Sequence, residues 1–157
     1  MNHFREKTSS DTNYVTIRDG GGCSSSVGMR GGQQWLTLSQ SGCYSKSTIQ
    51  HEFIHAMGFD HVQSRPDREQ YVTIHYDNIK GGEGNLNFEL LSDSWLTFGV
   101  AYDPKSFMHY HWNAFAKDYS KPTISSKFQG ILKKTQLNQT LMKNLFCSRF
   151  LVYLTLH

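Results

Sequence analysis

The chain has 157 residues and a mass of 18.0 kDa, enough for one domain. Its 38% hydrophobic and 13% aromatic residues are typical of a globular protein and exclude a disordered one. The 16 basic and 13 acidic residues are scattered rather than gathered into a stripe, which argues against a nucleic-acid-binding surface. The longest apolar stretches, 95–102 and 150–156, are too short for a membrane span.

The first seven residues contain neither an apolar segment nor a small-residue cleavage site, so this chain shows no signal peptide. The three cysteines are Cys23, Cys43 and Cys147. An odd number leaves at least one thiol without an internal partner if the others are paired. Whether they are paired depends on the compartment, because disulfides persist only in oxidising ones.

The first half of the chain predicts two strands and a helix. Residues 14–17 and 34–38 are rich in β-prone side chains, and glycine-rich segments precede or follow them. Residues 47–58 contain neither Gly nor Pro before their last position and predict a helix. Ser47 or Thr48 would cap its start, and Gly58 supplies a left-handed stop.

The second half of the chain differs from the first in composition. Residues 59–130 contain several glycines and prolines between short aromatic clusters, which predicts a loop-rich segment without an extended sheet. A second helix is expected at about 134–146, where apolar residues recur on one face as in ordinary core packing.

Histidines at helical spacing mark the most informative stretch of the chain. On a helix, positions i and i+4 lie about 40° apart around the axis. His51 and His55 therefore project from one face and can share one metal ion. Gly58 lets the chain leave the helix in a conformation that a Cβ would penalise, and this turn can bring His61 to the same ion.

Three neutral imidazoles and one open position are the arrangement of a catalytic zinc site. Zinc lowers the pKa of bound water towards about 7, and Glu52, beside the first ligand, can take its proton. The alternative is a surface helix with coincidental histidines. The fixed offsets of Gly58 and His61 argue against that alternative.

A second element follows at 106–110, with the sequence Ser-Phe-Met-His-Tyr. The metzincin signature pairs the long histidine motif with a later methionine turn. Met108 would provide a soft apolar floor beneath the imidazoles, although a methionine is more often core filler. Its place beside Tyr110 favours the site role, whereas His109 and His111 are interpreted as structural or solvent-facing.

At this point the sequence resembles the astacin zinc endopeptidases, a family of the metzincins. The resemblance runs from about Phe4 to Cys147. Besides the histidine motif, it rests on short blocks at 22–28, 31–34, 42–43, 65–68, 71–74 and 102–110.

The resemblance implies a role for each site residue. His51, His55 and His61 match the zinc ligands, and Glu52 matches the general base. Tyr110 matches a tyrosine that is an extra zinc ligand at rest and stabilises the oxyanion when substrate binds.

The resemblance also implies a disulfide between Cys23 and Cys43, which would place the protein in an oxidising, extracellular compartment. Residues 23–26 resemble the edge that pairs with the backbone of a substrate by strand addition.

Three departures from the family pattern stand out. The family's N-terminal strand and backing helix have no counterpart here, so we expect an uncovered apolar face. The expected partner of Cys147 would lie near Met1, which makes Cys147 free or bonded to another molecule. Val62 replaces the glutamate that receives the mature N-terminus, and it suits a chain without that anchor.

We therefore expect an α+β, zincin-like catalytic domain over 1–147, followed by a tail of unknown role at 148–157. An N-terminal sheet with the active-site helix would lie over a loop-rich C-terminal half that ends in a helix. The expected activity is zinc-dependent hydrolysis of internal peptide bonds, with one Zn²⁺ per chain and a protein or peptide substrate. The alternative is a zinc-binding fold, or an unstable fragment, without turnover.

Overall fold

The computed structural model describes residues 5–92, 97, 99–128 and 153–155. The chain divides into two compact units, Met1–Asp60 with Gln139–His157, and His61–Asn138. Among the described residues, none of the helices has the length and apolar character that crossing a membrane requires.

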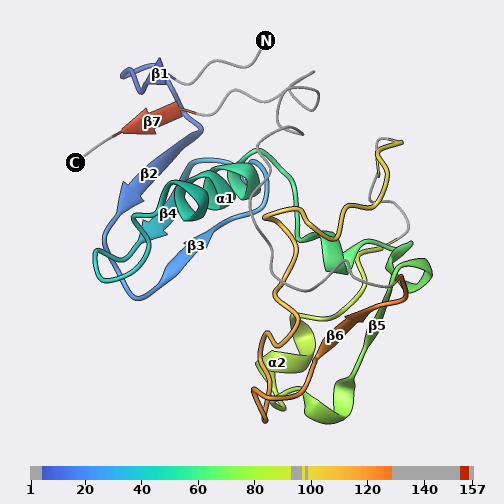
Figure 1. Ribbon diagram of the computed structural model, residues 1–157. Helices are drawn as coiled ribbons and strands as arrows, with labels where there is room; N and C mark the ends of the chain where they lie inside the picture. The colour runs from blue at the N-terminus through green and yellow to red at the C-terminus, as the bar shows by residue number, and fades with distance from the viewer. Residues whose placement is uncertain (1–4, 93–96, 98, 129–152, 156–157) are drawn as a thin grey trace. The chain divides into compact units, whose positions relative to one another are not determined.

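The first unit contains a five-stranded sheet in the order β1-β7-β2-β4-β3 (Figure 1). Its strands are β1 (Arg5–Glu6), β2 (Tyr14–Arg18), β3 (Cys23–Ser25), β4 (Gln33–Leu38) and β7 (Tyr153–Thr155). β2 and β4 are parallel, whereas β3 runs antiparallel to β4 at one edge. The two strands predicted from the sequence, 14–17 and 34–38, are thus confirmed within a residue at each end.

Alternation of side chains explains why these segments form a half-buried sheet. In β4, Leu36 and Leu38 are buried, while Gln33 and Trp35 are exposed. Ile17 lies opposite Leu36 in the parallel register, so the two side chains share the apolar face.

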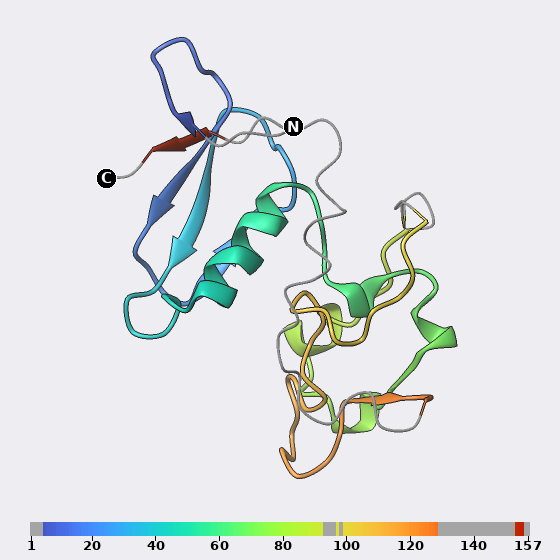
Figure 2. The same ribbon diagram turned by 45° about the horizontal axis from the view of Figure 1, so that its top comes forward.

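Helix α1 (Lys46–Ala56) lies against the β3 and β4 side of the sheet, as the second view shows (Figure 2). The expected N-cap at Ser47 or Thr48 is wrong. Ser45 is the cap, and its hydroxyl accepts a hydrogen bond from the backbone N–H of Thr48 at 3.1 Å. Ser45 takes this role because the helix begins directly after it, so its side chain reaches an N–H of the first turn that has no partner within the helix.

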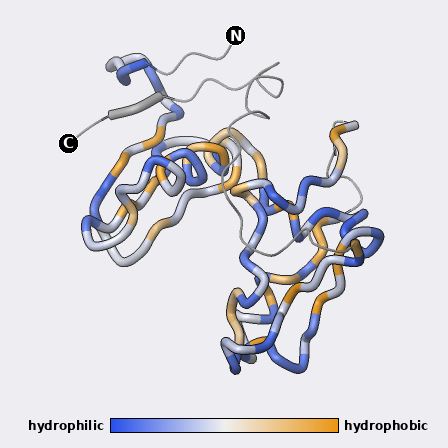
Figure 3. Tube along the Cα trace, viewed as in Figure 1, coloured by the Kyte–Doolittle hydropathy of each residue, from blue (hydrophilic) through white to orange (hydrophobic). Residues whose placement is uncertain are grey.

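The second unit is loop-rich, as the sequence predicts. β5 (Val72–Ile74) and β6 (Ile124–Ser126) form an antiparallel pair, and α2 (Glu83–Leu86) is a single turn. Short 3₁₀ turns occur at Val62–Ser64, Arg68–Gln70 and Tyr76–Asn78. The core consists of Val72, Ile79, Phe88, Tyr102 and Ile124. The trace coloured by hydropathy shows short hydrophobic stretches between hydrophilic ones along the chain (Figure 3).

A buried arginine holds these loops together. Arg68 is 2% exposed and donates hydrogen bonds to the carbonyl oxygens of Gln63 and Phe88 and to the hydroxyl of Tyr76. The planar guanidinium suits this task because it offers five donors in a fixed geometry. Loop carbonyls that no sheet satisfies are thereby paired inside the unit.

The remaining predictions concern the C-terminal part of the chain. The helix predicted at 134–146 and Cys147 lie outside the described residues. Within the tail, Tyr153–Thr155 form β7, which pairs in parallel with β2 and β1, a strand that the sequence did not predict.

Candidate metal centre

Helix α1 places two imidazoles side by side. His51 and His55 are one helical turn apart, and their ring centroids lie 4.6 Å from each other. Their Nε2 atoms are 3.0 Å apart, so both nitrogens face one space. This is the shared face that the i, i+4 spacing predicts.

The helix ends in a turn that redirects the chain after His55. Gly58 has φ +101°, and its N–H donates to the carbonyl of His55 at 2.8 Å. The N–H of Phe59 donates to the carbonyl of Ile54 at 3.2 Å. This pair of bonds is the Schellman motif, which favours glycine at the left-handed position. The predicted glycine stop is therefore confirmed.

The turn brings a third imidazole to the first two. One ligand atom each from His51, His55 and His61 can be chosen so that all lie within 4.8 Å of one another. His55 is buried, and the other two are half-buried. Three nitrogens at this spacing can hold one zinc ion.

The tautomer of His55 is set by its other ring nitrogen. Nδ1 lies 2.8 Å from the carbonyl oxygen of Phe59, which can only accept a hydrogen bond, so Nδ1 carries the proton. Nε2 then keeps its lone pair towards His51. Such an outer hydrogen bond orients a metal-binding imidazole and raises its basicity.

Glu52 lies on the same helix and is 4% exposed. Its Oε2 is buried without a hydrogen-bond partner among the described residues, and burial raises the pKa of the carboxyl to about 7. A buried carboxylate oxygen without a partner is costly, and such exceptions cluster at functional sites. The three imidazole nitrogens are a donor set that fits a zinc ion, and this buried oxygen lies on the same helix as two of them.

The segment around the expected methionine turn is bonded to the chain just beyond His61. The N–H of Val62 donates to the carbonyl of Met108 at 3.0 Å, and Met108 is 5% exposed. The ring of Tyr110 lies 4.5 Å from that of His61, and its hydroxyl points to Asn87 Oδ1 at 3.4 Å. Tyr110 is thus adjacent to one of the three histidines, whereas the role of Met108 as a floor stays a prediction.

Sequence reasoning missed several neighbours of Tyr110. Its ring also packs against Phe88 and Phe115, with centroids 5.7 and 5.5 Å away. Phe115 has φ +56°, a left-handed conformation that is uncommon for a bulky residue. No sequence pattern marks this position, because the strain arises from the surrounding fold.

His109, interpreted as structural or solvent-facing, is buried, whereas His111 is exposed. Burial lowers the pKa of the His109 imidazole, which favours its neutral form. Burial also raises the pKa of the Tyr102 phenol, so its hydroxyl keeps its proton. These two groups are hydrogen-bonded to each other at 2.8 Å.

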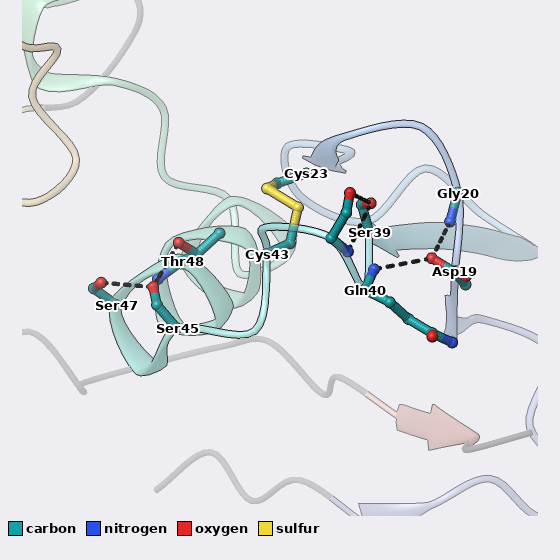
Figure 4. Close-up of a disulfide and its surroundings, with 10 residues drawn as sticks. Asp19, Gly20, Cys23, Ser39, Gln40, Cys43, Ser45, Ser47 and Thr48 are labelled. Carbon is teal, nitrogen blue, oxygen red and sulfur yellow. Dashed lines mark hydrogen bonds between the residues drawn. A yellow bond between two sulfur atoms is a disulfide. The ribbon is translucent and has the colours of Figure 1, made fainter.

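A disulfide joins the edge strand to the segment before α1. The predicted bond between Cys23 and Cys43 is present, and it stands close to the Ser45 cap (Figure 4). Asp19 Oδ1 accepts hydrogen bonds from the N–H groups of Gly20 and Gln40, which ties the turns after β2 and β4 together (Figure 4). Both ends of the stretch that carries β3 and β4 are therefore fixed.

Comparison with known proteins agrees with this geometry. Residues 2–143 match the model of the peptidase family Astacin. The chain is 42% identical over 130 residues to zinc metalloproteinase nas-30 of Caenorhabditis elegans, a match that covers 78% of this chain and 17% of that protein. It is 44% identical over 119 residues to meprin A subunit beta of Homo sapiens, covering 74% and 16%. The chain thus spans about one sixth of the length of these relatives.

A solved structure gives the same result for the fold. High choriolytic enzyme 1, a hatching enzyme zinc-protease from Oryzias latipes, superposes with a TM-score of 0.76 at 32% identity, covering 83% of this chain and 64% of that one. The predicted α+β, zincin-like fold is confirmed.

Proposed function

The chain belongs to the astacin family of peptidases, and from this membership we propose that it is a zinc-dependent endopeptidase that hydrolyses internal peptide bonds. One observation carries the proposal. Three imidazole nitrogens lie within 4.8 Å of one another, and the same helix carries a buried carboxylate oxygen without a partner among the described residues. Ligands together with a base are what metal-assisted hydrolysis needs.

The three histidines would hold one zinc ion per chain. His51 and His55 come from helix α1, and His61 comes from the turn that Gly58 permits. The chemistry that zinc supplies when bound is Lewis-acid polarisation of a carbonyl and a lowered pKa of water.

Glu52 would act as the general base and then as the general acid. Its carboxylate takes a proton from the attacking water and passes it to the amine of the cleaved bond. The raised pKa of Glu52 suits this double task, because proton transfer is most efficient when the pKa lies near the working pH. Burial of the carboxyl is the physical cause of that shift.

Tyr110 would stabilise the negative charge that develops on the carbonyl oxygen. Its phenol is next to the His61 ring and is half-buried, so that a hydrogen bond from its O–H acts in a medium of low dielectric constant. Met108 would form the apolar floor of the site.

Strand β3 offers a place for the substrate backbone. In the described sheet, β3 pairs only with β4, so its other edge can receive an extended peptide. The disulfide at Cys23 fixes this strand and thereby reduces the entropy cost of binding.

The extracellular compartment is the proposed location, because a disulfide between Cys23 and Cys43 persists in an oxidising environment. Cys147 is the remaining thiol and would be free or bonded to another molecule. Mass spectrometry of the non-reduced chain, with and without a reductant, distinguishes these two states.

The test is cleavage of casein or a quenched peptide by the full chain, with and without a zinc chelator. Glu52→Ala should retain zinc, as measured by elemental analysis, and lose cleavage by a factor of about 10² to 10⁴. Glu6→Ala is the matched control, because Glu6 is an exposed carboxylate on β1. A folded chain with one zinc ion and no cleavage would instead support the non-catalytic zinc-binding alternative.

A further inference from the structure

The backbone of Tyr110 is held on both sides by buried side chains. Its N–H donates to Oε1 of Gln63 at 3.1 Å. Its carbonyl oxygen lies 2.8 Å from Nδ1 of His109. Gln63 is fully buried and His109 is 7% exposed, so neither bond competes with bulk water.

The partners of His109 fix its tautomer. The Tyr110 carbonyl can only accept, so Nδ1 of a neutral His109 carries the proton and donates it. Nε2 is then an acceptor, and the hydroxyl of Tyr102 at 2.8 Å donates to it. Tyr102 thereby stabilises the tautomer that the Tyr110 carbonyl requires.

Tyr102 is itself locked in place. Its ring stacks on Tyr71, with centroids 4.6 Å apart and an angle of 5° between the planes. The guanidinium of Arg65 lies 5.4 Å from the Tyr102 ring centroid. Arg65 is in turn held by Asp67, to which it donates at 2.7 and 2.9 Å. The hydroxyl of Tyr102 therefore has little freedom to turn away from His109.

The side-chain amide of Gln63 is in an environment that is typical of a functional residue. Its Oε1 accepts from Tyr110, but its Nε2 is buried without a hydrogen-bond partner among the described residues. An unpaired buried amide costs free energy, and natural proteins retain such costs mainly at functional sites. The N–H of the neighbouring Val62 donates to the carbonyl of Met108, so the whole turn is attached beside His61.

We propose that Tyr102, His109 and Gln63 are positioning residues, which orient the backbone of Tyr110 so that its phenol meets the developing oxyanion. This role rests on the proposed peptidase function. The residues act through Tyr110 and do not touch the substrate. Misplacement of a reacting group by about 1 Å can cost 10²-fold in rate, so the orientation of this backbone has a measurable effect.

The test compares two amide substitutions at His109 in the full zinc-loaded chain. His109→Asn places an N–H donor where Nδ1 stands, whereas His109→Gln places it nearer to Nε2 and loses the bond to the Tyr110 carbonyl. We expect kcat of His109→Gln to fall about tenfold or more below that of His109→Asn, with KM and zinc content unchanged. His111→Gln is the matched control, because His111 is exposed. Equal losses in both His109 variants would overturn the proposal.

A second comparison shows whether the effect passes through Tyr110. In a Tyr110→Phe background, His109→Gln should cause no further loss of kcat, since the hydroxyl that it orients is absent. A further tenfold loss in that background would mean that His109 acts elsewhere, and would contradict the assignment.

A readout without turnover separates this proposal from the peptidase function. In the full chain with ¹⁵N-labelled histidine, NMR should show His109 neutral and protonated at Nδ1, and Tyr102→Phe should change that tautomer population. If the wild-type chain cleaves no peptide, the peptidase function is overturned. The tautomer of His109 then tests only the hydrogen-bond arrangement around that residue. A neutral His109 protonated at Nε2 in place of Nδ1 would refute the positioning role.

Discussion

Single atoms determine what each residue near the three histidines can do. The proton on His55 Nδ1 is committed to the carbonyl of Phe59, so Nε2 is left as a lone-pair donor. The phenol O–H of Tyr110 donates a long hydrogen bond, 3.4 Å, to Oδ1 of Asn87. A bond of that length is weak, so Asn87 by itself contributes little to holding the hydroxyl.

Tyr110→Phe tests the role of this hydroxyl. The substitution keeps the ring contacts with His61, Phe88 and Phe115, and we expect kcat to fall by about 10² to 10³ while zinc content stays the same. Steady-state kinetics with elemental analysis measure both quantities. Tyr119→Phe is the control, since Tyr119 is 60% exposed. A kcat like that of the unmodified chain would remove Tyr110 from the mechanism.

Among the elements, helix α1 and its C-terminal turn position the three proposed zinc ligands. The Schellman bonds of Gly58 and Phe59 end the helix before His61, and the positive φ of Gly58 sets the new direction of the chain. Gly28 also donates to the His55 carbonyl at 2.8 Å, which ties the loop after β3 to this turn. The ligand geometry therefore depends on glycine at position 58.

Gly58→Ala should lower the free energy of unfolding by about 1–2 kcal/mol, because a Cβ is strained at φ +101°. We also expect weaker zinc binding, since His61 would be displaced. Urea denaturation and a competitive zinc titration measure these effects. Gly21→Ala is the control, because a Cβ there meets no atom within 4 Å and the backbone is not left-handed. Gly58→Ala with unchanged stability would show that the turn does not need glycine.

Local patterns predicted much of this element and little of its surroundings. The strands, the helix and the glycine stop follow from side-chain periodicity and propensity, which are properties of neighbours in sequence. The N-cap was wrong because Ser45, Ser47 and Thr48 are all capable caps, and only the geometry of the first turn selects one. Gln63 was missed because its contact with Tyr110 joins residues 47 positions apart.

For the molecule as a whole, the Cys23–Cys43 disulfide is a covalent cross-link in the described part of the first unit. It closes a loop with a sequence separation of 20 residues, which contains β4. Such a cross-link stabilises the fold mainly because it restricts the unfolded chain.

The double variant Cys23→Ser/Cys43→Ser should lose about 3 kcal/mol of unfolding free energy, the entropy expected for a loop of this size. Urea denaturation with and without a reductant is the measurement. The reductant should destabilise the unmodified chain and leave the variant unchanged. If the variant and the unmodified chain are equally stable without reductant, the stabilising role assigned to the disulfide is contradicted.

The rate of peptide cleavage during a titration of the metal-free chain with zinc tests the proposed zinc peptidase site. We expect the rate to rise linearly and to reach its maximum near one equivalent, because His51, His55 and His61 form one site per chain. His61→Ala should need much more zinc to reach its maximum. Cleavage that is independent of zinc, or one tightly bound equivalent without cleavage, would contradict a zinc peptidase at this site.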